Sequence, residues 1–93
     1  EVLASKTPVI VDYWAPWCGP CKMMAPVFEK TSHELKSVKF VKLNVDENQH
    51  LAQEQGILGI PCMVIYKNGE ELARIVGFQT EAQFKQKLTA AIQ

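Results

Sequence analysis

The stretch VIVDYWAPWCGPCKMM, residues 9–24, decides the fold because it joins a buried strand to the start of a helix. Residues 9–14 are apolar apart from Asp12 and rich in β-branched and aromatic side chains, which predicts a strand covered on both faces. From Cys18 onward the apolar residues recur at helical spacing, and Pro20 suits the first turn of a helix. We therefore expect a short loop, residues 15–17, to carry Cys18 from the strand to a helix N-terminus.

The rest of the chain predicts an α/β fold, with a mixed central sheet of about four strands flanked by helices on both faces. Pro26 should kink the first helix without ending it, because the apolar stripe continues in phase to Leu35. Asn68-Gly69 is a two-residue hairpin signal that joins the last two strands. The other expected elements are strands over 38–45, 62–66 and 71–76, a short helix over 50–55 capped by Asp46 or Asn48, and a closing helix after the capping box of Thr80 and Gln83.

Length and composition limit the classes of function that the chain can have. With 93 residues, 47% of them hydrophobic, the chain fits a single domain, residues 1–93. Ten basic residues balance ten acidic ones, so no overall field attracts nucleic acid or an anionic membrane, and no apolar run approaches the ~20 residues that span a bilayer. Three cysteines with one close pair favour a reducing compartment, the cytoplasm or an organelle stroma or matrix.

The pair Cys18 and Cys21 is the candidate for chemistry. A cysteine at a helix N-terminus faces unpaired backbone N–H groups and the positive end of the helix dipole, and both favour thiolate over thiol. Cys21 lies one turn further on, within disulfide reach. Cys18 is thus the predicted nucleophile and Cys21 the resolving thiol of reversible disulfide exchange. Gly19 and Pro20 offer the thiolate no charge or side-chain hydrogen bond, which favours a reductant over an oxidase or isomerase.

Half of a zinc site is the other common meaning of Cys-x-x-Cys. Such sites usually supply a second close pair of Cys or His, and this sequence has none. His33 and His50 stand alone in polar helical segments, typical of solvated surface histidines. No cofactor or resident metal is therefore expected.

The signature Trp14-Ala15-Pro16-Trp17-Cys18-Gly19-Pro20-Cys21-Lys22 resembles the active site of the thioredoxin family over its whole length. The resemblance continues through residues 42–46, 59–61, 67–70 and 76–77 and covers nearly the whole chain. It implies a disulfide reductase without a cofactor, which takes electrons from a thioredoxin reductase and passes them to disulfide-containing proteins. It further implies a cis peptide bond before Pro61 and a substrate-binding surface made by Trp17, Gly19, Pro20, Ile60, Pro61 and Gly77.

Asp12 is a lone carboxylate in an apolar strand, so burial should raise its pKa toward neutrality and let it carry a proton. The family resemblance implies that Asp12 lies behind Cys21 and exchanges a proton with it. It also implies that Lys42 approaches the same carboxylate. A purely structural, hydrogen-bonded Asp12 is the alternative interpretation.

Two features depart from the family. In the family, a strand and most of a helix usually precede the segment that matches residues 1–8, and here they are missing. We therefore expect a shortened chain, a lower stability or pairing through an exposed strand at residues 38–45. The chain is otherwise expected to be a monomer. Cys62 stands where threonine is common. It is interpreted as a small buried residue, or as an accessory thiol that joins exchange or completes a three-thiolate metal or cluster site.

The leading hypothesis is a general protein disulfide reductase. The alternative from another class is a binding module, which uses the groove or a metal held by Cys18, Cys21 and Cys62 without turnover.

Overall fold

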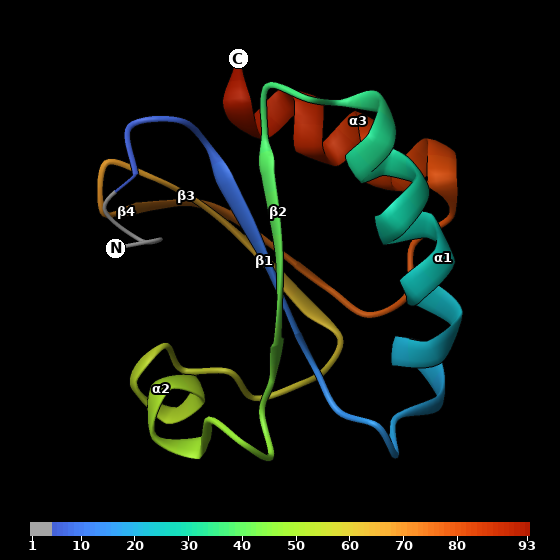
Figure 1. Cartoon of the computed structure of the whole chain (residues 1–93), viewed down its shortest axis with the longest axis vertical. Helices are drawn as coiled ribbons and strands as arrows, with labels where there is room; N and C mark the ends of the chain where they lie inside the picture. Colours follow the sequence, from blue (N-terminus) through green and yellow to red (C-terminus); the bar gives the residue numbers. More distant parts are fainter. Residues whose placement is uncertain (1–4) are drawn as a thin grey trace.

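The computed structural model describes residues 5–93, which form one mixed sheet with helices on both faces (Figure 1). The strands are β1 (Val9–Trp14), β2 (Lys39–Asn44), β3 (Cys62–Lys67) and β4 (Glu70–Val76), and the helices are α1 (Gly19–Glu34), α2 (Gln49–Glu54) and α3 (Glu81–Ile92). The sheet order is β2-β1-β3-β4, with β1 and β2 parallel and the other two pairs antiparallel. The predicted α/β fold class and element order are confirmed. No helix in residues 5–93 has the length and apolarity needed to cross a bilayer.

The sheet separates two apolar clusters. Helices α1 and α3 pack on one face through Met24, Phe28, Phe84 and Leu88, which meet Ile10 of β1. Helix α2 lies on the other side, beside one end of the strands (Figure 1). The apolar residues that the strands contribute on that side are Val9, Val11, Tyr13, Cys62, Val64 and Tyr66. Because alternate residues of a strand point to opposite faces, Ile10 and Asp12 face α1, whereas Tyr13 and Cys62 face the α2 side.

Local signals account for most of the element ends. Helix α1 runs through Pro26 without ending there, as expected. Asn68 and Gly69 both have positive φ, 55° and 79°, which is the geometry that a two-residue hairpin turn requires. The predicted side-chain cap of α2 is wrong: Asn48 is the N-cap residue, but its side chain donates to the Asn44 carbonyl at 3.0 Å and caps nothing.

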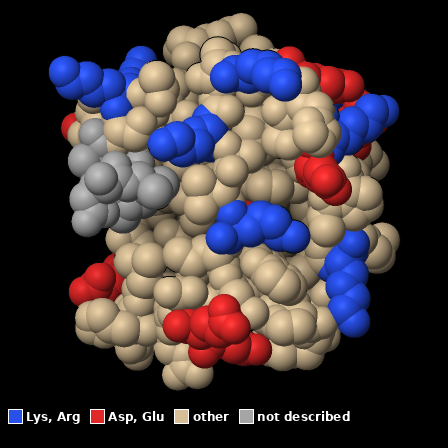
Figure 2. Space-filling view, in the orientation of Figure 1, with Lys and Arg blue, Asp and Glu red and all other residues tan. Residues whose placement is uncertain are grey.

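Strand β2 lies at the edge of the described sheet, and its apolar side chains Phe40, Val41 and Leu43 are half-buried. The edge position predicted for this strand is thus seen in the described sheet, and pairing through it stays a prediction. Charges of both signs are interspersed over the face in Figure 2, in keeping with the zero net charge.

Helix α3 begins at the predicted capping box, in which Thr80 Oγ1 accepts from the Gln83 amide at 3.2 Å and Gln83 Oε1 accepts from the Thr80 amide at 3.1 Å. Thr80→Ala removes one of these bonds and should lower the free energy of unfolding by about 1 kcal/mol. Thr89→Ala is the matched control, because Thr89 is exposed within the same helix and alanine is the better helix former. Urea unfolding of both variants measures the difference, and equal stabilities would contradict the cap.

Candidate active site

Cys18 lies at the junction between strand β1 and helix α1. The turn of residues 15–17 is closed by the Cys18 amide, which donates to the Ala15 carbonyl at 3.2 Å. Cys18 is the N-cap residue of α1, and its Sγ accepts from the Cys21 amide at 3.1 Å. This sulfur therefore takes the place of the side-chain oxygen that usually caps a helix, and it receives the backbone N–H that would stabilise a thiolate.

The structure joins Cys18 and Cys21 in a disulfide, with their Cα atoms 5.2 Å apart. Both residues are almost wholly buried, at 5% and 3% exposure. Gly19 and Pro20, which lie between them in the sequence, are exposed. The spacing predicted for a redox pair is thus present.

A second segment of chain borders the disulfide. The Ile60 carbonyl oxygen lies 3.8 Å from Cys18 Sγ, and the Ile60–Pro61 peptide bond is cis, as the family resemblance implied. The Gly77 amide donates to the Pro61 carbonyl at 2.8 Å. Gly77 has φ +89°, a conformation that glycine adopts readily, and at this residue the chain leaves β4. The structure therefore brings Ile60 to the disulfide and links Gly77 to the neighbouring Pro61.

Exposed apolar side chains lie on the chain segments that flank this site. Trp17 is 68% exposed, and its Nε1 donates to Asp46 Oδ2 at 2.9 Å. Leu58 is fully exposed and Val76 is 57% exposed. Sequence reasoning missed the role of Asp46, because no local pattern pairs a carboxylate with an indole 29 residues away.

Asp12 is 1% exposed and its side chain points to the α1 side of the sheet, where Cys21 belongs to the buried stripe of the helix. Burial raises the pKa of Asp12 from 3.8 to about 6, and the charge of Lys42 opposes this increase. Asp12 Oδ1 is buried and, among the described residues, has no hydrogen-bond partner. Both interpretations of Asp12, the proton carrier and the purely structural carboxylate, therefore stay predictions.

Lys42 is the register partner of Asp12 on β2. Its ammonium lies 4.8 Å from the centroid of the Trp14 ring, a cation–π contact. Within residues 5–93 the structure has no ion pair between Lys42 and Asp12. The expected partnership is consequently limited to a long-range charge effect.

Cys62 is buried at 1% exposure and free, and burial raises the pKa of its thiol. It pairs with Tyr13 across β1 and β3 and packs in the α2-side cluster, whereas Cys18 and Cys21 pack with Ala15. Within residues 5–93, no three His, Cys, Asp or Glu side chains are placed together so that they could hold a metal ion. The three sulfurs thus form no common ligand set, and the buried interpretation of Cys62 fits the structure.

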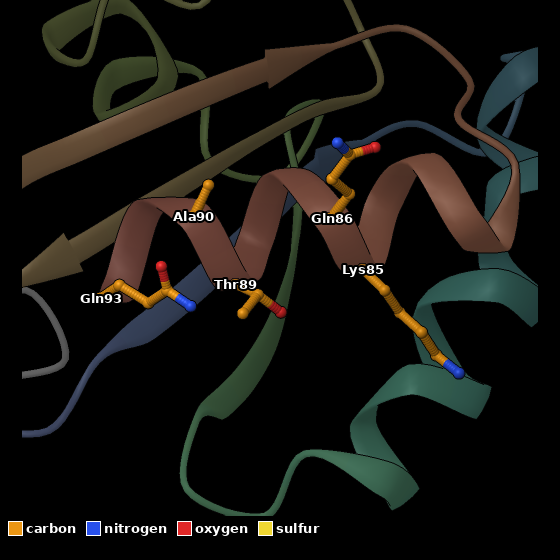
Figure 3. A pocket seen from close by; sticks show the side chains of 5 residues that line it. All are labelled: Lys85, Gln86, Thr89, Ala90 and Gln93. Atoms are coloured by element: carbon orange, nitrogen blue, oxygen red, sulfur yellow. The ribbon is translucent and has the colours of Figure 1, made fainter.

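A shallow hollow on α3 is unrelated to this site (Figure 3). It is lined by Lys85, Gln86, Thr89, Ala90 and Gln93. None of these side chains is a predicted site residue, and Lys85 points away toward α1, where it pairs with Glu34.

Comparison with known proteins identifies related chains. The family model described as Thioredoxin matches residues 1–90. A thioredoxin from Rickettsia felis is 50% identical over 80 residues, 85% of this chain and 76% of that protein. A thioredoxin from Nostoc is 44% identical over 89 residues, 95% of this chain and 83% of its own length. The crystal structure of a Malassezia sympodialis thioredoxin superposes with a TM-score of 0.90 at 39% identity, covering 99% of this chain and 83% of that one.

The raised pKa of Asp12 makes stability depend on pH. The folded protein binds the Asp12 proton more tightly than the unfolded chain does, so stability is lost as pH rises from about 4 to 6. A pKa increase from 3.8 to about 6 corresponds to about 3 kcal/mol of instability above that range. Asp12→Asn should therefore be more stable than the parent by up to about 3 kcal/mol near pH 8 and lose this advantage toward pH 4.

Urea unfolding at the two pH values measures this effect. Glu47→Gln, which neutralises an exposed carboxylate, should show no comparable gain. An Asp12→Asn advantage that is the same at both pH values would contradict the buried, titrating carboxyl.

Proposed function

The chain belongs to the thioredoxin family and is a protein thiol-disulfide oxidoreductase, and from that premise we propose that it is a general reductant of disulfides in other proteins. The observation that carries the proposal is the Cys18–Cys21 disulfide at the N-terminus of α1, bordered by the Ile60 carbonyl. In this proposal residues 1–93 act as one domain. Its substrates are disulfide-containing proteins.

Cys18 is the proposed nucleophile. Its thiolate attacks one sulfur of the substrate disulfide, the substrate S–S bond breaks, and the other substrate sulfur leaves and takes a proton. The product is a mixed disulfide between Cys18 and the substrate. The Cys21 amide, 3.1 Å from Cys18 Sγ, and the helix dipole stabilise the attacking thiolate.

Cys21 then resolves this intermediate. Its thiolate attacks Cys18 Sγ, the second substrate sulfur departs, and two electrons have passed to the substrate when the Cys18–Cys21 disulfide forms. Asp12 is the proposed proton acceptor for Cys21, since a carboxyl with a pKa of about 6 is largely ionised at neutral pH. The positive charge of Lys42 favours the ionised form of Asp12. A thioredoxin reductase is the proposed electron donor that restores the dithiol.

Substrate binding is assigned to the surface around the disulfide. An extended substrate segment would lie along the backbone of Ile60 and Pro61, beside Gly77, in a form of strand addition. Exposed Trp17, held by Asp46, would border the bound segment, and Gly19 and Pro20 would line the approach to Cys18. We place the activity in a reducing compartment, such as the cytoplasm, because the redox cycle needs a reduced Cys18.

Cysteine variants test the proposed roles. Cys18→Ser should abolish reduction of insulin disulfides, whereas Cys21→Ser should accumulate a mixed disulfide that mass spectrometry detects. Cys62→Thr should retain the parental rate, because Cys62 lies in a separate cluster. An active Cys18→Ser variant would contradict the assignment of the nucleophile. Loss of activity in Cys62→Thr with the fold intact would restore an accessory role for that thiol.

Asp12→Asn separates the two chemical steps. The amide cannot accept the Cys21 proton, so resolution of the mixed disulfide should slow by about tenfold or more, while its formation by Cys18 changes much less. Stopped-flow fluorescence with a protein disulfide resolves the two phases. Equal slowing of both phases would count against a proton acceptor that serves Cys21.

A further inference from the structure

A polar network on the α2 side of the sheet holds the chain segment that borders the disulfide. Its centre is Arg74 of β4, which pairs with Val64 and therefore faces α2. Arg74 Nη2 donates to the Gln55 carbonyl at 2.8 Å, and Nη1 donates to the Gly56 carbonyl at 3.0 Å. These two carbonyls follow directly after α2, where helix carbonyls lack partners and attract a cation.

A strand irregularity makes this arrangement possible. Residues three apart in a regular strand point to opposite faces, so Glu71 and Arg74 would normally lie apart. The register shift between Ile65 and Tyr66 places Glu71 opposite Tyr66 and leaves Leu72 as the extra residue. Glu71 consequently shares a face with Arg74 and accepts from Nε at 2.9 Å and from Nη2 at 2.8 Å. This bidentate pair orients the guanidinium plane toward the end of α2.

The side chain of Gln55 is held as well as its backbone. Tyr66 donates to Gln55 Oε1 at 2.9 Å, and the hydroxyl of Tyr13 lies 2.9 Å from that of Tyr66. The end of α2 is thus tied to three strands, through Tyr13 of β1, Tyr66 of β3 and Arg74 of β4.

Helix α2 needs such an anchor because little else holds it. It has six residues, its N-cap makes no side-chain cap bond, and Ala52 is its one buried residue. A helix this short is not stable without tertiary contacts. The position of the following segment therefore depends on the contacts made at Gln55 and Gly56.

That segment, residues 57–60, ends at the disulfide. It begins at Ile57, whose amide donates to the Ala52 carbonyl at 3.0 Å, and ends at Ile60, whose carbonyl oxygen lies 3.8 Å from Cys18 Sγ. Strand β4 and the residue after it hold both ends of this segment, since Arg74 bonds to Gln55 and Gly56 and Gly77 bonds to Pro61.

We propose that Arg74 is a positioning residue for protein substrates, because it fixes the end of α2 and thereby the segment 57–60 beside Cys18. This inference rests on the proposed docking of substrates along Ile60. Arg74 itself does not touch the reacting sulfurs. Its removal frees the segment, so it weakens the docking of an extended polypeptide more than the attack of Cys18 on a small disulfide.

The test compares two disulfide substrates. Arg74→Met keeps the length and apolar stem of the side chain but removes all four hydrogen bonds. For the reduced protein, the rate constant with insulin should fall by about tenfold, and that with a small aromatic disulfide by less than about twofold. Glu70→Gln is the matched control: it removes an exposed charge from the same strand but none of the hydrogen bonds of Arg74, so both rate constants should stay within about twofold of the parent.

Hydrogen exchange supplies an independent readout. In Arg74→Met the Ile57 amide should exchange about tenfold faster, whereas amides of β1 and β3 keep their protection. Should Arg74→Met fail to fold, Arg74→Lys replaces it in both measurements, because one ammonium cannot bond two carbonyls and two carboxylate oxygens at once. The same selective loss is then expected, to a smaller extent.

Unchanged insulin reduction in the Arg74 variant, or equal loss with both substrates, would overturn the positioning role. Cys18→Ser in the same assay reports on the proposed function alone. Loss of both reactions in Cys18→Ser together with an unaffected Arg74 variant would therefore reject the inference about Arg74 and leave the nucleophile in place.

Discussion

The contact between the Cys21 amide and Cys18 Sγ, at 3.1 Å, is the interaction on which the site depends. It exists because β1 ends just before the turn that places Cys18 at the N-cap of α1. A helix N-terminus offers unpaired N–H groups and a partial positive charge, and here both are directed at a sulfur. The same helical turn places Cys21 within bonding distance, so one local arrangement would both activate the proposed nucleophile and provide its partner.

The sheet keeps the other parts of the site in fixed relation to this turn. Asp12 lies on β1 and faces α1, and burial of its carboxyl raises the pKa to about 6. The Ile60 carbonyl is brought to Cys18 by a segment whose two ends are held by Arg74 of β4 and by Gly77, which follows β4. In the proposed function, proton transfer would therefore use Asp12 on the α1 side of the sheet, and substrate docking would use the segment 57–60 that follows α2.

Much of this could be predicted from the sequence, because the relevant signals are local. The Cys-x-x-Cys at the strand-to-helix junction, the buried Asp12 and the capping box of Thr80 each depend on a few neighbouring residues. The missed features join distant segments: Asp46 holds Trp17, and Arg74 reaches the end of α2 only because Leu72 is an extra residue in β4. The hydrophobic pattern of the sequence does not indicate that the pairing of two strands shifts by one residue. Lys42 shows the same limit, since strand register places it beside Asp12 but its ammonium lies over Trp14.

The most direct test of the account is the pH dependence of alkylation at each thiol of the reduced protein. Iodoacetamide modification from about pH 5 to 9, read by mass spectrometry, compares Cys18 with Cys62 and with a cysteine in an unstructured peptide. The account predicts that Cys18 reacts first and stays reactive at acidic pH where the peptide thiol is slow, while buried Cys62 is protected. A Cys18 profile that matches the peptide would contradict the claim that the helix N-terminus activates this sulfur.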